Sequence, residues 1–355
     1  MRRRTFKYRI YPSKSQKRVL ENTLKTCCNL YNSALEERIS AWKKQKINIS
    51  YYDQTHQLPE IKQFYPELND VYSQVLCNVL NKLKKSFDNF FRRMKLKQVP
   101  GFPRFKNYKR YNSFIYPQTG FKIENNRLIL SKIGSIHIKL HRLIQGKIKN
   151  CCIKRDGNQW FAIFVCELED RQQTNNTNSV GIDVGIENFI ALSNGELVSN
   201  PKWYRKTEKK LVKLQQKKKH IQKVYRKVRN QRLDFQHKLS RKLANEFGII
   251  CVEKLNINKM VNSIHSKSIL DAGWNQFINL LSYKVEETGG KVVFVNPAYT
   301  SQTCPECGKI KQKTLEERQH ICSCGCTMDR DVAINIFQRF LQGPYGALYK
   351  PKDLG

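Results

Sequence analysis

The pattern of hydrophobic and polar positions predicts a strand and two long helices at the start of the chain. Residues 5–11 alternate between apolar and polar side chains, which is the period of a half-buried strand. Pro12 and Ser13 then open a helix, because Ser13 and Gln16 have the spacing of a capping box. The apolar stripe of this helix consists of Val19, Leu20, Leu24, Cys27, Cys28, Tyr31, Ala34 and Leu35.

A second long helix is expected over residues 69–95. Its apolar positions at helical spacing are Tyr72, Leu76, Val79, Leu83, Phe87 and Phe90. Its far end is basic, with Arg92, Arg93, Lys95 and Lys97 close together. The simplest interpretation of both apolar stripes is packing in a hydrophobic core.

After residue 100 the pattern changes to short alternating runs with Gly and Asn turns, which predicts a small antiparallel barrel or sandwich. The strand at 5–11 has no other sheet to join, so we assign it to the same sheet, with the two helices inserted between. The expected strands are Ser113–Tyr116, Arg127–Leu130, Ser135–Leu140, Lys147–Lys154 and Trp160–Glu167.

A polar stretch without an apolar anchor, residues 171–178, reads as a linker. Beyond it the pattern predicts an α/β domain that is interrupted by a basic helical arm. The elements expected in this domain are a hairpin over 179–193, strands over 247–255 and 291–296, and a helix over 272–288.

The charge of the chain points to a polyanionic partner. It has 355 residues, with 65 Lys+Arg against 29 Asp+Glu and a net charge of +36. Self-repulsion of this size opposes folding unless a polyanion neutralises it, and nucleic acid phosphates do so with release of counterions. A membrane-surface protein can also be basic, but no apolar run has the length of a bilayer span and the N-terminus lacks a signal-peptide core. We therefore expect a cytoplasmic protein of a prokaryote, associated with the nucleoid.

Much of this charge is concentrated in residues 202–242, which hold seventeen Lys/Arg and only Glu208 and Asp234 as acids. The stretch reads as helical, but as a merely solvated helix its cations would repel one another, because almost no acid lies four residues away. Binding along a nucleic acid duplex or an RNA scaffold is the better interpretation.

Five of the twelve cysteines cluster near the C-terminus. The first knuckle is Cys304-Pro-Glu-Cys307-Gly, and the second contains Cys322, Cys324 and Cys326. Two short cysteine turns about fifteen residues apart suit a tetrahedral zinc ion. The other seven cysteines lie in apolar contexts, where a reduced thiol behaves as a small hydrophobe. The sequence thus predicts a structural zinc site rather than a disulfide framework.

Carboxylates in apolar strands provide candidate catalytic residues. Asp183 lies within Val-Gly-Ile-Asp-Val-Gly-Ile and Glu253 within Ile-Ile-Cys-Val-Glu-Lys-Leu, while Asp329 and Asp331 come directly after the cysteine ribbon. Such an acid is costly to bury unless it is paired or binds a metal. Each acid alone has a simpler explanation, an ion pair with a basic group, but three converging carboxylates suit two Mg²⁺ or Mn²⁺ ions that catalyse phosphodiester cleavage.

The order of these motifs closely resembles TnpB, a family of transposon-encoded RNA-guided nucleases from which compact type V CRISPR effectors descend. The N-terminal segment and Gly101-Phe-Pro-Arg-Phe-Lys106 also look like those of the family. The motifs that carry the resemblance are Gly181-Ile-Asp183-Val-Gly185, Val252-Glu253-Lys-Leu255-Asn256, Tyr299-Thr-Ser301-Gln-Thr-Cys304-Pro-Glu-Cys307-Gly308 and Asp329-Arg-Asp331.

The resemblance implies a multidomain α+β protein: a wedge-like β-barrel with a helical recognition insert, then a RuvC nuclease domain of RNase H type with an inserted zinc ribbon. It also implies a guide RNA from the transposon end, and double-stranded target DNA with a short adjacent motif that the N-terminal half reads. Cleavage would fall to Asp183, Glu253 and Asp331. The expected bounds are 1–12 and 96–170 for the barrel, 13–95 for the insert, 179–355 for the nuclease domain, 202–245 for its basic arm and 299–328 for its ribbon.

The second knuckle departs from the family pattern. The family usually has Cys-x-x-Cys-Gly, whereas this chain has Cys322-x-Cys324-Gly325 and then Cys326. Gly325 matches the knuckle glycine, so we assign Cys324 as the fourth zinc ligand and Cys326 as a spare cysteine. A site with the Cys322/Cys326 pair remains an alternative. His320 is close enough to compete, although we interpret it as an ordinary residue of the ribbon.

The third motif departs as well. In the family it runs Asp-Arg-Asp-x-Asn-Ala-Ala-x-Asn-Ile, whereas two residues are missing here between Asp331 and Asn335. Aligned from the ribbon, Asp331 is catalytic; aligned from Asn335, Asp329 takes its place. A two-residue deletion rotates a helix by about 200°. We assign Asp331 because the ribbon fixes the position of the residues directly after it.

Three functions compete at this point. The leading one is cleavage of DNA directed by a guide RNA. The altered third motif keeps a non-cleaving, repressor-like RNA-guided binder open, and a compact type V CRISPR-like effector is a further alternative. A transposase that acts directly on DNA ends fits poorly, because no tyrosine or serine recombinase motif stands out.

Overall fold

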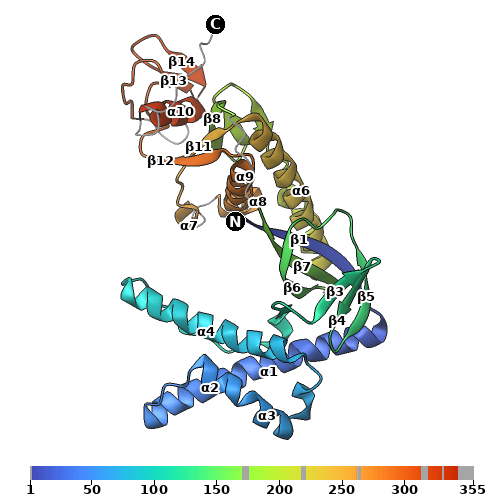
Figure 1. The fold of residues 1–355 in the computed structure, drawn as a ribbon. Coiled ribbons are helices and arrows are strands. Elements are labelled where there is room, and N and C mark those ends of the chain that lie inside the picture. The colour runs from blue at the N-terminus through green and yellow to red at the C-terminus, as the bar shows by residue number, and fades with distance from the viewer. Residues whose placement is uncertain are drawn as a thin grey trace. The chain divides into compact units, whose positions relative to one another are not determined.

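The computed structural model describes residues 2–169, 176–216, 221–260, 262, 265–312, 319–329 and 332–342 (Figure 1). They belong to two compact units, Met1–Asp170 and Arg171–Gly355. Most of the expected linker, residues 171–175, lies outside the described residues. No described helix has the length and apolarity needed to cross a membrane.

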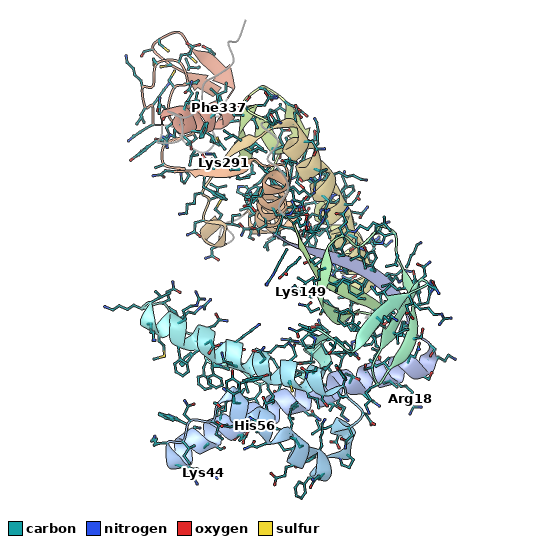
Figure 2. The ribbon with its side chains drawn as sticks, viewed as in Figure 1. Arg18, Lys44, His56, Lys149, Lys291 and Phe337 are labelled. Carbon is teal, nitrogen blue, oxygen red and sulfur yellow. The ribbon has the colours of Figure 1, made fainter. Side chains whose placement is uncertain are left out.

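The first unit inserts its helices after its first strand, β1 (Arg2–Tyr11). The expected capping box of the first helix is confirmed: Ser13 Oγ accepts from the Gln16 N–H at 3.2 Å, and Gln16 Oε1 accepts from the Ser13 N–H at 3.0 Å. Figure 2 labels Arg18 near the start of this helix and Lys44 near its end. The helices are α1 (Lys14–Gln45), α2 (Tyr51–His56), α3 (Leu58–Phe64), α4 (Ser73–Lys95), and the 3₁₀ turns η1 (Pro66–Leu68) and η2 (Tyr108–Arg110).

The sheet of the first unit has seven antiparallel strands in the order β2-β6-β7-β1-β5-β4-β3. β1 pairs with β7 from Arg2↔Leu168 to Ile10↔Trp160 and with β5 near its other end, so the first strand lies in the middle of the sheet. The later strands are β2 (Ser113–Tyr116), β3 (Phe121–Glu124), β4 (Arg127–Leu130), β5 (Gly134–Lys139), β6 (Lys147–Asp156) and β7 (Gln159–Leu168).

Aromatic residues on the two edge strands of this sheet contact each other. The ring of Tyr116 on edge strand β2 lies 6.5 Å from that of Phe121 on the opposite edge strand β3. The Tyr116 hydroxyl also donates to the carbonyl oxygen of Ser131, just after β4, at 2.9 Å. Phe121 contacts the buried Phe164 of β7 from inside. The sheet is therefore barrel-like and nearly closed around an aromatic core.

The second unit contains a mixed five-stranded sheet in the order β10-β9-β8-β11-β12. β8, β9 and β10 form an antiparallel meander, whereas β11 pairs in parallel with both β8 and β12. The bounds are β8 (Ser179–Val184), β9 (Asn188–Leu192), β10 (Leu197–Ser199), β11 (Ile249–Glu253) and β12 (Lys291–Val295). The mixed α/β content that the sequence predicted is confirmed at this coarse level.

Helices cover both faces of this sheet. Ile250 and Val252 of β11 face a core formed with α6 (Gln222–Glu246) and α9 (Trp274–Glu287). The intervening Cys251 faces the other way, into a core with α10 (Val332–Gln342). Side chains alternate along a strand, so the continuous apolar run of β11 is buried on both sides.

The basic stretch beyond residue 202 forms two helices in the described residues, α5 (Trp203–Gln216) and α6. The end of α6 is a layer of the core, since Leu239, Leu243 and Ala244 are buried against the sheet. The helix expected over 272–288 is confirmed as α9, whereas the short helix before it, which ends at Gly273 with a φ of 66°, was not predicted. The remaining elements are α7 (Ile257–Met260), α8 (Ser266–Ala272), β13 (Gln319–Ile321) and β14 (Thr327–Asp329).

Candidate metal sites

Asp183 and Glu253 lie on adjacent parallel strands. The paired register of the two strands ends at Ile182↔Val252, and these two acids are the next residues on β8 and β11. Residues at the same register on parallel strands share a face of the sheet, and neighbouring strands are about 4.8 Å apart. Both acids are partly exposed and lie near the carboxyl ends of their strands. The fold thus places two of the predicted carboxylates next to each other on neighbouring strands.

A hydrogen-bond network holds Glu253 from behind. The buried Thr300 hydroxyl donates to Glu253 Oε1. Thr300 is fixed in turn by Asn335 of α10, whose Nδ2 donates to the carbonyl oxygens of Thr300 and Thr303, each at 2.8 Å. Asn335 is itself buried. This network connects β11, the loop after β12 and the last helix, and it restricts the orientation of the Glu253 side chain.

The last helix packs tightly on β8 beside Asp183. A Cβ atom on Gly181 would lie 2.9 Å from Phe337 Cβ and still closer to the Ala333 carbonyl oxygen, so only glycine permits this approach. The helix begins at Val332. The predicted third acid, Asp331, lies outside the described residues. Asp329 ends β14, and its side chain is likewise not described.

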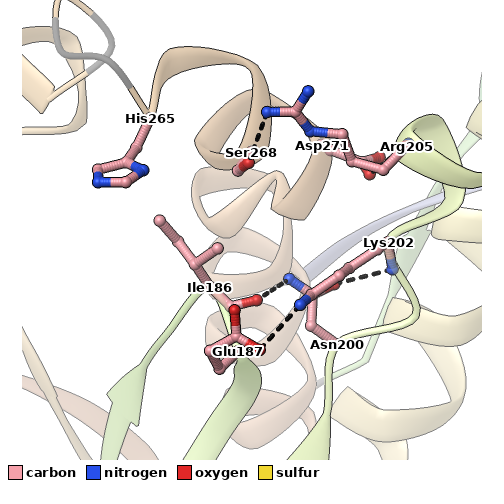
Figure 3. Close-up of a pocket in the computed structure, with 8 residues that line it drawn as sticks. All are labelled: Ile186, Glu187, Asn200, Lys202, Arg205, His265, Ser268 and Asp271. Carbon is pink, nitrogen blue, oxygen red and sulfur yellow. Dashed lines mark hydrogen bonds and ion pairs between the residues drawn. The ribbon is translucent and has the colours of Figure 1, made fainter. Parts of the chain in front are cut away.

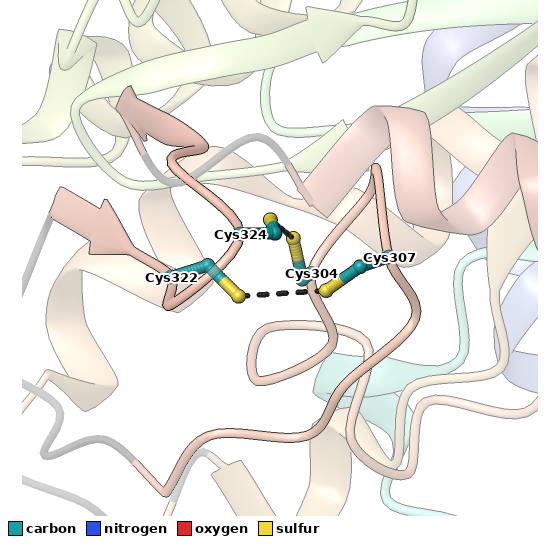
Figure 4. Close-up of side chains that lie close together, drawn as sticks. All are labelled: Cys304, Cys307, Cys322 and Cys324. Carbon is teal, nitrogen blue, oxygen red and sulfur yellow. Dashed lines mark hydrogen bonds between the residues drawn. The ribbon is translucent and has the colours of Figure 1, made fainter.

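Four cysteine sulfur atoms form a compact cluster near the C-terminus (Figure 4). The Sγ atoms of Cys304, Cys307, Cys322 and Cys324 all lie within 4.8 Å of one another. Cys307 and Cys322 are 3.5 Å apart and Cys304 and Cys324 are 3.7 Å apart. Zinc–sulfur bonds of about 2.3 Å in a tetrahedron give sulfur separations of about 3.8 Å, so these four residues fit a zinc ion.

The cluster contains Cys324 and leaves out Cys326. Gly325 between them has a φ of 92°, which turns the chain as a knuckle requires. The carbonyl oxygen of Cys326 accepts from the Cys322 N–H at 2.9 Å, and Cys326 itself is buried. The side chain of His320 lies outside the described ones.

Local hydrogen bonds favour the thiolate in part of the cluster. Desolvation raises the pKa of the Cys304 thiol, but backbone N–H groups of Cys307 and Glu306 outweigh it and lower the pKa to about 6. By contrast, burial raises the pKa of Cys27 and of Cys251 to about 12. Within the cluster, a backbone hydrogen bond lowers the pKa of Cys324, but desolvation and hydrogen bonds with neighbouring thiols outweigh it and raise the pKa to about 12, so the thiolate is favoured at only some of the four residues.

Three family models match parts of the chain. One described as "Helix-turn-helix domain" (HTH_OrfB_IS605) matches residues 1–46, one described as "Probable transposase" (OrfB_IS605) matches 163–263, and one described as "Cas12f1-like, TNB domain" matches 274–336. In this structure residues 2–45 form β1 and one continuous helix, α1, rather than a helix-turn-helix.

Relatives match over nearly the full length. A protein of Streptomyces pristinaespiralis named as an RNA-guided DNA endonuclease is 31% identical, with 93% of this chain and 87% of the relative covered. The chain belongs to the TnpB family. The RNA-guided DNA endonuclease InsQ of Escherichia coli (strain K12) is 29% identical over 90% of this chain and 87% of its own. A TnpB-like protein of Acanthamoeba polyphaga mimivirus is 25% identical over 92% of this chain and 70% of its own.

Among solved structures, a Cas12f1–sgRNA–target DNA complex aligns with 95% of this TnpB-family chain and 99% of its own, at 17% identity and a TM-score of 0.38. A CRISPR–Cas12f ternary complex gives 15% identity and a TM-score of 0.37, over 96% of this chain and 82% of its own. Scores of this size do not establish a common arrangement of the whole chain.

One ionic centre of this TnpB-family chain gave no signal in the sequence patterns. The buried Asp271 of α8 accepts from the Tyr204 N–H at 2.9 and 3.0 Å, which caps the first turn of α5. It also pairs with Arg232 of α6 at 2.9 Å. One carboxylate thus joins three helices. The sequence around Asp271 contains no motif, so this role could not be predicted from it.

Asp271 also lines a pocket of about 480 Å³ (Figure 3). Glu187 of the turn after β8 forms an ion pair with Lys202 at 2.9 Å on one wall. On the opposite wall Arg205 donates to the Ser268 hydroxyl at 3.3 Å. The cations here are balanced by acids, so the pocket has a mixed rather than a basic lining.

One acid of the basic helices, Glu208, is shared between two cations. Glu208 accepts from Lys267 at 2.9 Å and from Arg205 at 3.1 Å. These two hydrogen bonds, Lys267 first, lower the pKa of Glu208 below its usual value. The two acids of residues 202–242, Glu208 and Asp234, are too few to neutralise the seventeen Lys/Arg of this stretch.

Proposed function

We propose that this protein is an RNA-guided DNA endonuclease of an insertion-sequence transposon. The observation that carries the proposal is the placement of Asp183 and Glu253 side by side on parallel strands in a TnpB-family chain. Relatives that cover most of the chain are named as RNA-guided DNA endonucleases.

In the proposed mechanism the second unit is a RuvC nuclease domain of RNase H type. Asp183, Glu253 and Asp331 hold Mg²⁺ or Mn²⁺ through hard oxygen ligands. The chemistry that two such ions would supply is activation of the attacking water and stabilisation of the leaving oxygen of the phosphodiester. Thr300 acts as a positioning residue, because its hydrogen bond limits the rotation of the Glu253 carboxylate.

The cysteine cluster has a structural role in this proposal. Zinc on Cys304, Cys307, Cys322 and Cys324 fixes the two knuckles of a ribbon that ends directly before the third acid. The loop from β12 into the first knuckle also contains Thr300. The zinc ligands therefore lie in the sequence between Thr300, which positions Glu253, and the third acid, Asp331. Zinc would stabilise this segment without taking part in the reaction.

The proposed partners are a guide RNA and double-stranded target DNA with a short adjacent motif. The RNA pairs with the target strand, while the protein holds the heteroduplex by shape and charge. The net charge of +36 and the basic residues of α5 and α6 support this assignment. In the proposed division of labour, the helices of residues 13–95 and the β-barrel read the duplex, and the second unit cuts it.

One observation favours a second candidate function. The third motif lacks two residues between Asp331 and Asn335 compared with the family pattern. If this displaces the third carboxylate, the protein is an RNA-guided DNA-binding protein without cleavage, comparable to a repressor. A compact type V CRISPR-like effector would share the site but take its guide from another source.

Sequencing the RNA that copurifies with the full-length protein tests the proposal. We expect one dominant RNA whose 3′ part matches the sequence beyond a transposon end. That RNA, with Mg²⁺, should direct cleavage of a matching plasmid. A protein that copurifies with no RNA and is stable and monodisperse at low salt would contradict an obligate guide.

A further inference from the structure

The apolar stripe of α4 does not stay in the core along its whole length. Its first half is buried through Val75, Leu76, Val79, Leu80 and Leu83. Beyond Leu83 no described residue of the helix is buried, and its far end extends away from the sheet of the same unit (Figure 1). The simple prediction of core packing was therefore wrong for Phe90, and Phe87 packs only at the margin of the core.

Four phenylalanine rings form a cluster on this outer half. Phe102, from the segment after α4, meets Phe87 edge-on at 5.7 Å and Phe90 at 5.3 Å. Phe91 lies 6.3 Å from Phe87 and 5.2 Å from Phe90. Phe91 is 53% exposed and Phe102 is 48% exposed. We call Phe87, Phe90, Phe91 and Phe102 the aromatic cluster.

The aromatic cluster lies in a strongly basic segment. Residues 84–107 contain eight Lys/Arg and a single acid, Asp88, which pairs with Lys84 at 3.0 Å. Arg92 and Arg93 adjoin Phe91 in sequence, and Arg104 lies two residues beyond Phe102. Ring faces between cations are the combination that binds unpaired nucleotides, since bases stack on the rings while the cations hold the phosphates.

We propose that the aromatic cluster binds unpaired bases of a single-stranded RNA, and on the proposed function this RNA is a part of the guide. The local excess of positive charge opposes pairing with a second copy of the same surface. A solvent-exposed apolar surface promotes aggregation, so we expect a partner that covers it permanently. A guide RNA stays bound to the protein, whereas target DNA binds only transiently. Stacking also requires unpaired bases, because those of a duplex are already stacked.

The test titrates fluorescein-labelled oligouridylate with full-length protein that has been freed of bound RNA. We expect Phe91→Ala combined with Phe102→Ala to weaken binding by about tenfold or more, because each lost stack removes an attractive contact. Phe91→Tyr with Phe102→Tyr should bind like the unchanged protein, whereas the corresponding Leu pair should resemble the Ala pair. The matched control is Phe64→Ala, which removes a 72% exposed ring on α3, beside Glu60 and Glu67.

Salt dependence separates stacking from charge. The Ala pair should lower affinity equally at all salt concentrations, whereas Arg92→Gln with Arg93→Gln should reduce the slope of log affinity against log salt, because phosphate contacts release counterions. Unchanged oligouridylate binding by the Ala pair would overturn the proposal. So would a wild-type dimer that the Ala pair converts to a monomer, which would identify a second copy as the occupant. If the unchanged protein performs RNA-programmed cleavage and the Ala pair binds oligouridylate normally, only this inference is refuted. If the Ala pair binds oligouridylate more weakly but the unchanged protein shows no programmed cleavage, only the proposed function is refuted.

Discussion

The hydroxyl of Thr300 donates a hydrogen bond to the carboxylate of Glu253, although 47 positions separate the two residues in the chain. Thr300 is buried, and its own carbonyl oxygen is held by Asn335 from the last helix. The orientation of a strand-end carboxylate therefore depends on a loop and a helix that the chain reaches much later.

Replacing Thr300 by Val should slow metal-dependent cleavage by about tenfold while leaving target binding unchanged, because the Glu253 carboxylate samples other orientations once it has lost the hydrogen bond from Thr300. Thr300→Ser should restore most of the rate, since it returns the donor. Thr303→Val is the matched control: its hydroxyl donates to the Tyr299 carbonyl oxygen at 2.8 Å, away from Glu253. Equal rates for Thr300→Val and the unchanged protein would refute the positioning role.

One zinc ion per chain is expected in the purified protein. Cys304→Ser and Cys324→Ser should each release it and loosen the C-terminal region, because structural zinc contributes directly to folding. Cys326→Ser should keep the zinc, since the four sulfur atoms that lie together exclude this residue. Metal analysis by mass spectrometry measures the zinc content of each variant. Zinc lost from Cys326→Ser but kept by Cys324→Ser would make Cys326 the fourth ligand instead.

Asp271→Asn should lower the free energy of unfolding of the second unit by about 2 kcal/mol, measured as a shift of the urea midpoint. The change leaves Arg232 without its charged partner in a partly buried place. The control Asp234→Asn breaks an ion pair with Lys238, in which the Asp234 side chain is 64% exposed and that of Lys238 is 77% exposed. Such surface ion pairs contribute little to stability. Similar shifts for both variants would mean that Asp271 is not a structural centre.

Gly181→Ala should destabilise the second unit by about 1–3 kcal/mol, because the added methyl group forces α10 away from β8. It should also reduce cleavage, since the same helix carries Asn335. Gly101→Ala offers a matched control, because a Cβ there has no neighbour within 4 Å. An active and stable Gly181→Ala protein would show that the helix packs less closely on the strand.

Local signals in the sequence were sufficient for many elements. The alternation of β2 and β4 gave their bounds, the Ser13 capping box gave the start of α1, and the motif order gave the family. The helix α9 was predicted, but the short helix α8 before it was missed, and the two are separated by one glycine with positive φ. Such a glycine looks like any other until the backbone is known.

Contacts between distant residues could not be predicted in the same way. Asp271 acts through Tyr204 and Arg232, which lie far away in sequence, and periodicity contains no information about such pairs. Thr300 and Asn335 did stand within motifs of the TnpB family, so a signal for them existed. For the apolar stripe of α4 the sequence predicted packing that the outer half of the helix lacks. Periodicity indicates an apolar face but not whether other residues cover it.

The proposed function depends above all on Asp183 and Glu253 as the catalytic centre of a guided nuclease. Plasmid cleavage with the copurifying RNA, a matching target and Mg²⁺, beside a gel-shift measurement of target binding, tests this role. Asp183→Ala, Glu253→Ala and Asp331→Ala should each abolish cleavage with binding nearly unchanged, because each removes a proposed metal ligand while affinity comes from base pairing and backbone contacts. Asp329→Ala should have a much smaller effect, and the reverse order of the last two variants would move the third ligand to Asp329. Intact target binding without cleavage by the unchanged protein would contradict the proposed nuclease and identify an RNA-guided binder instead.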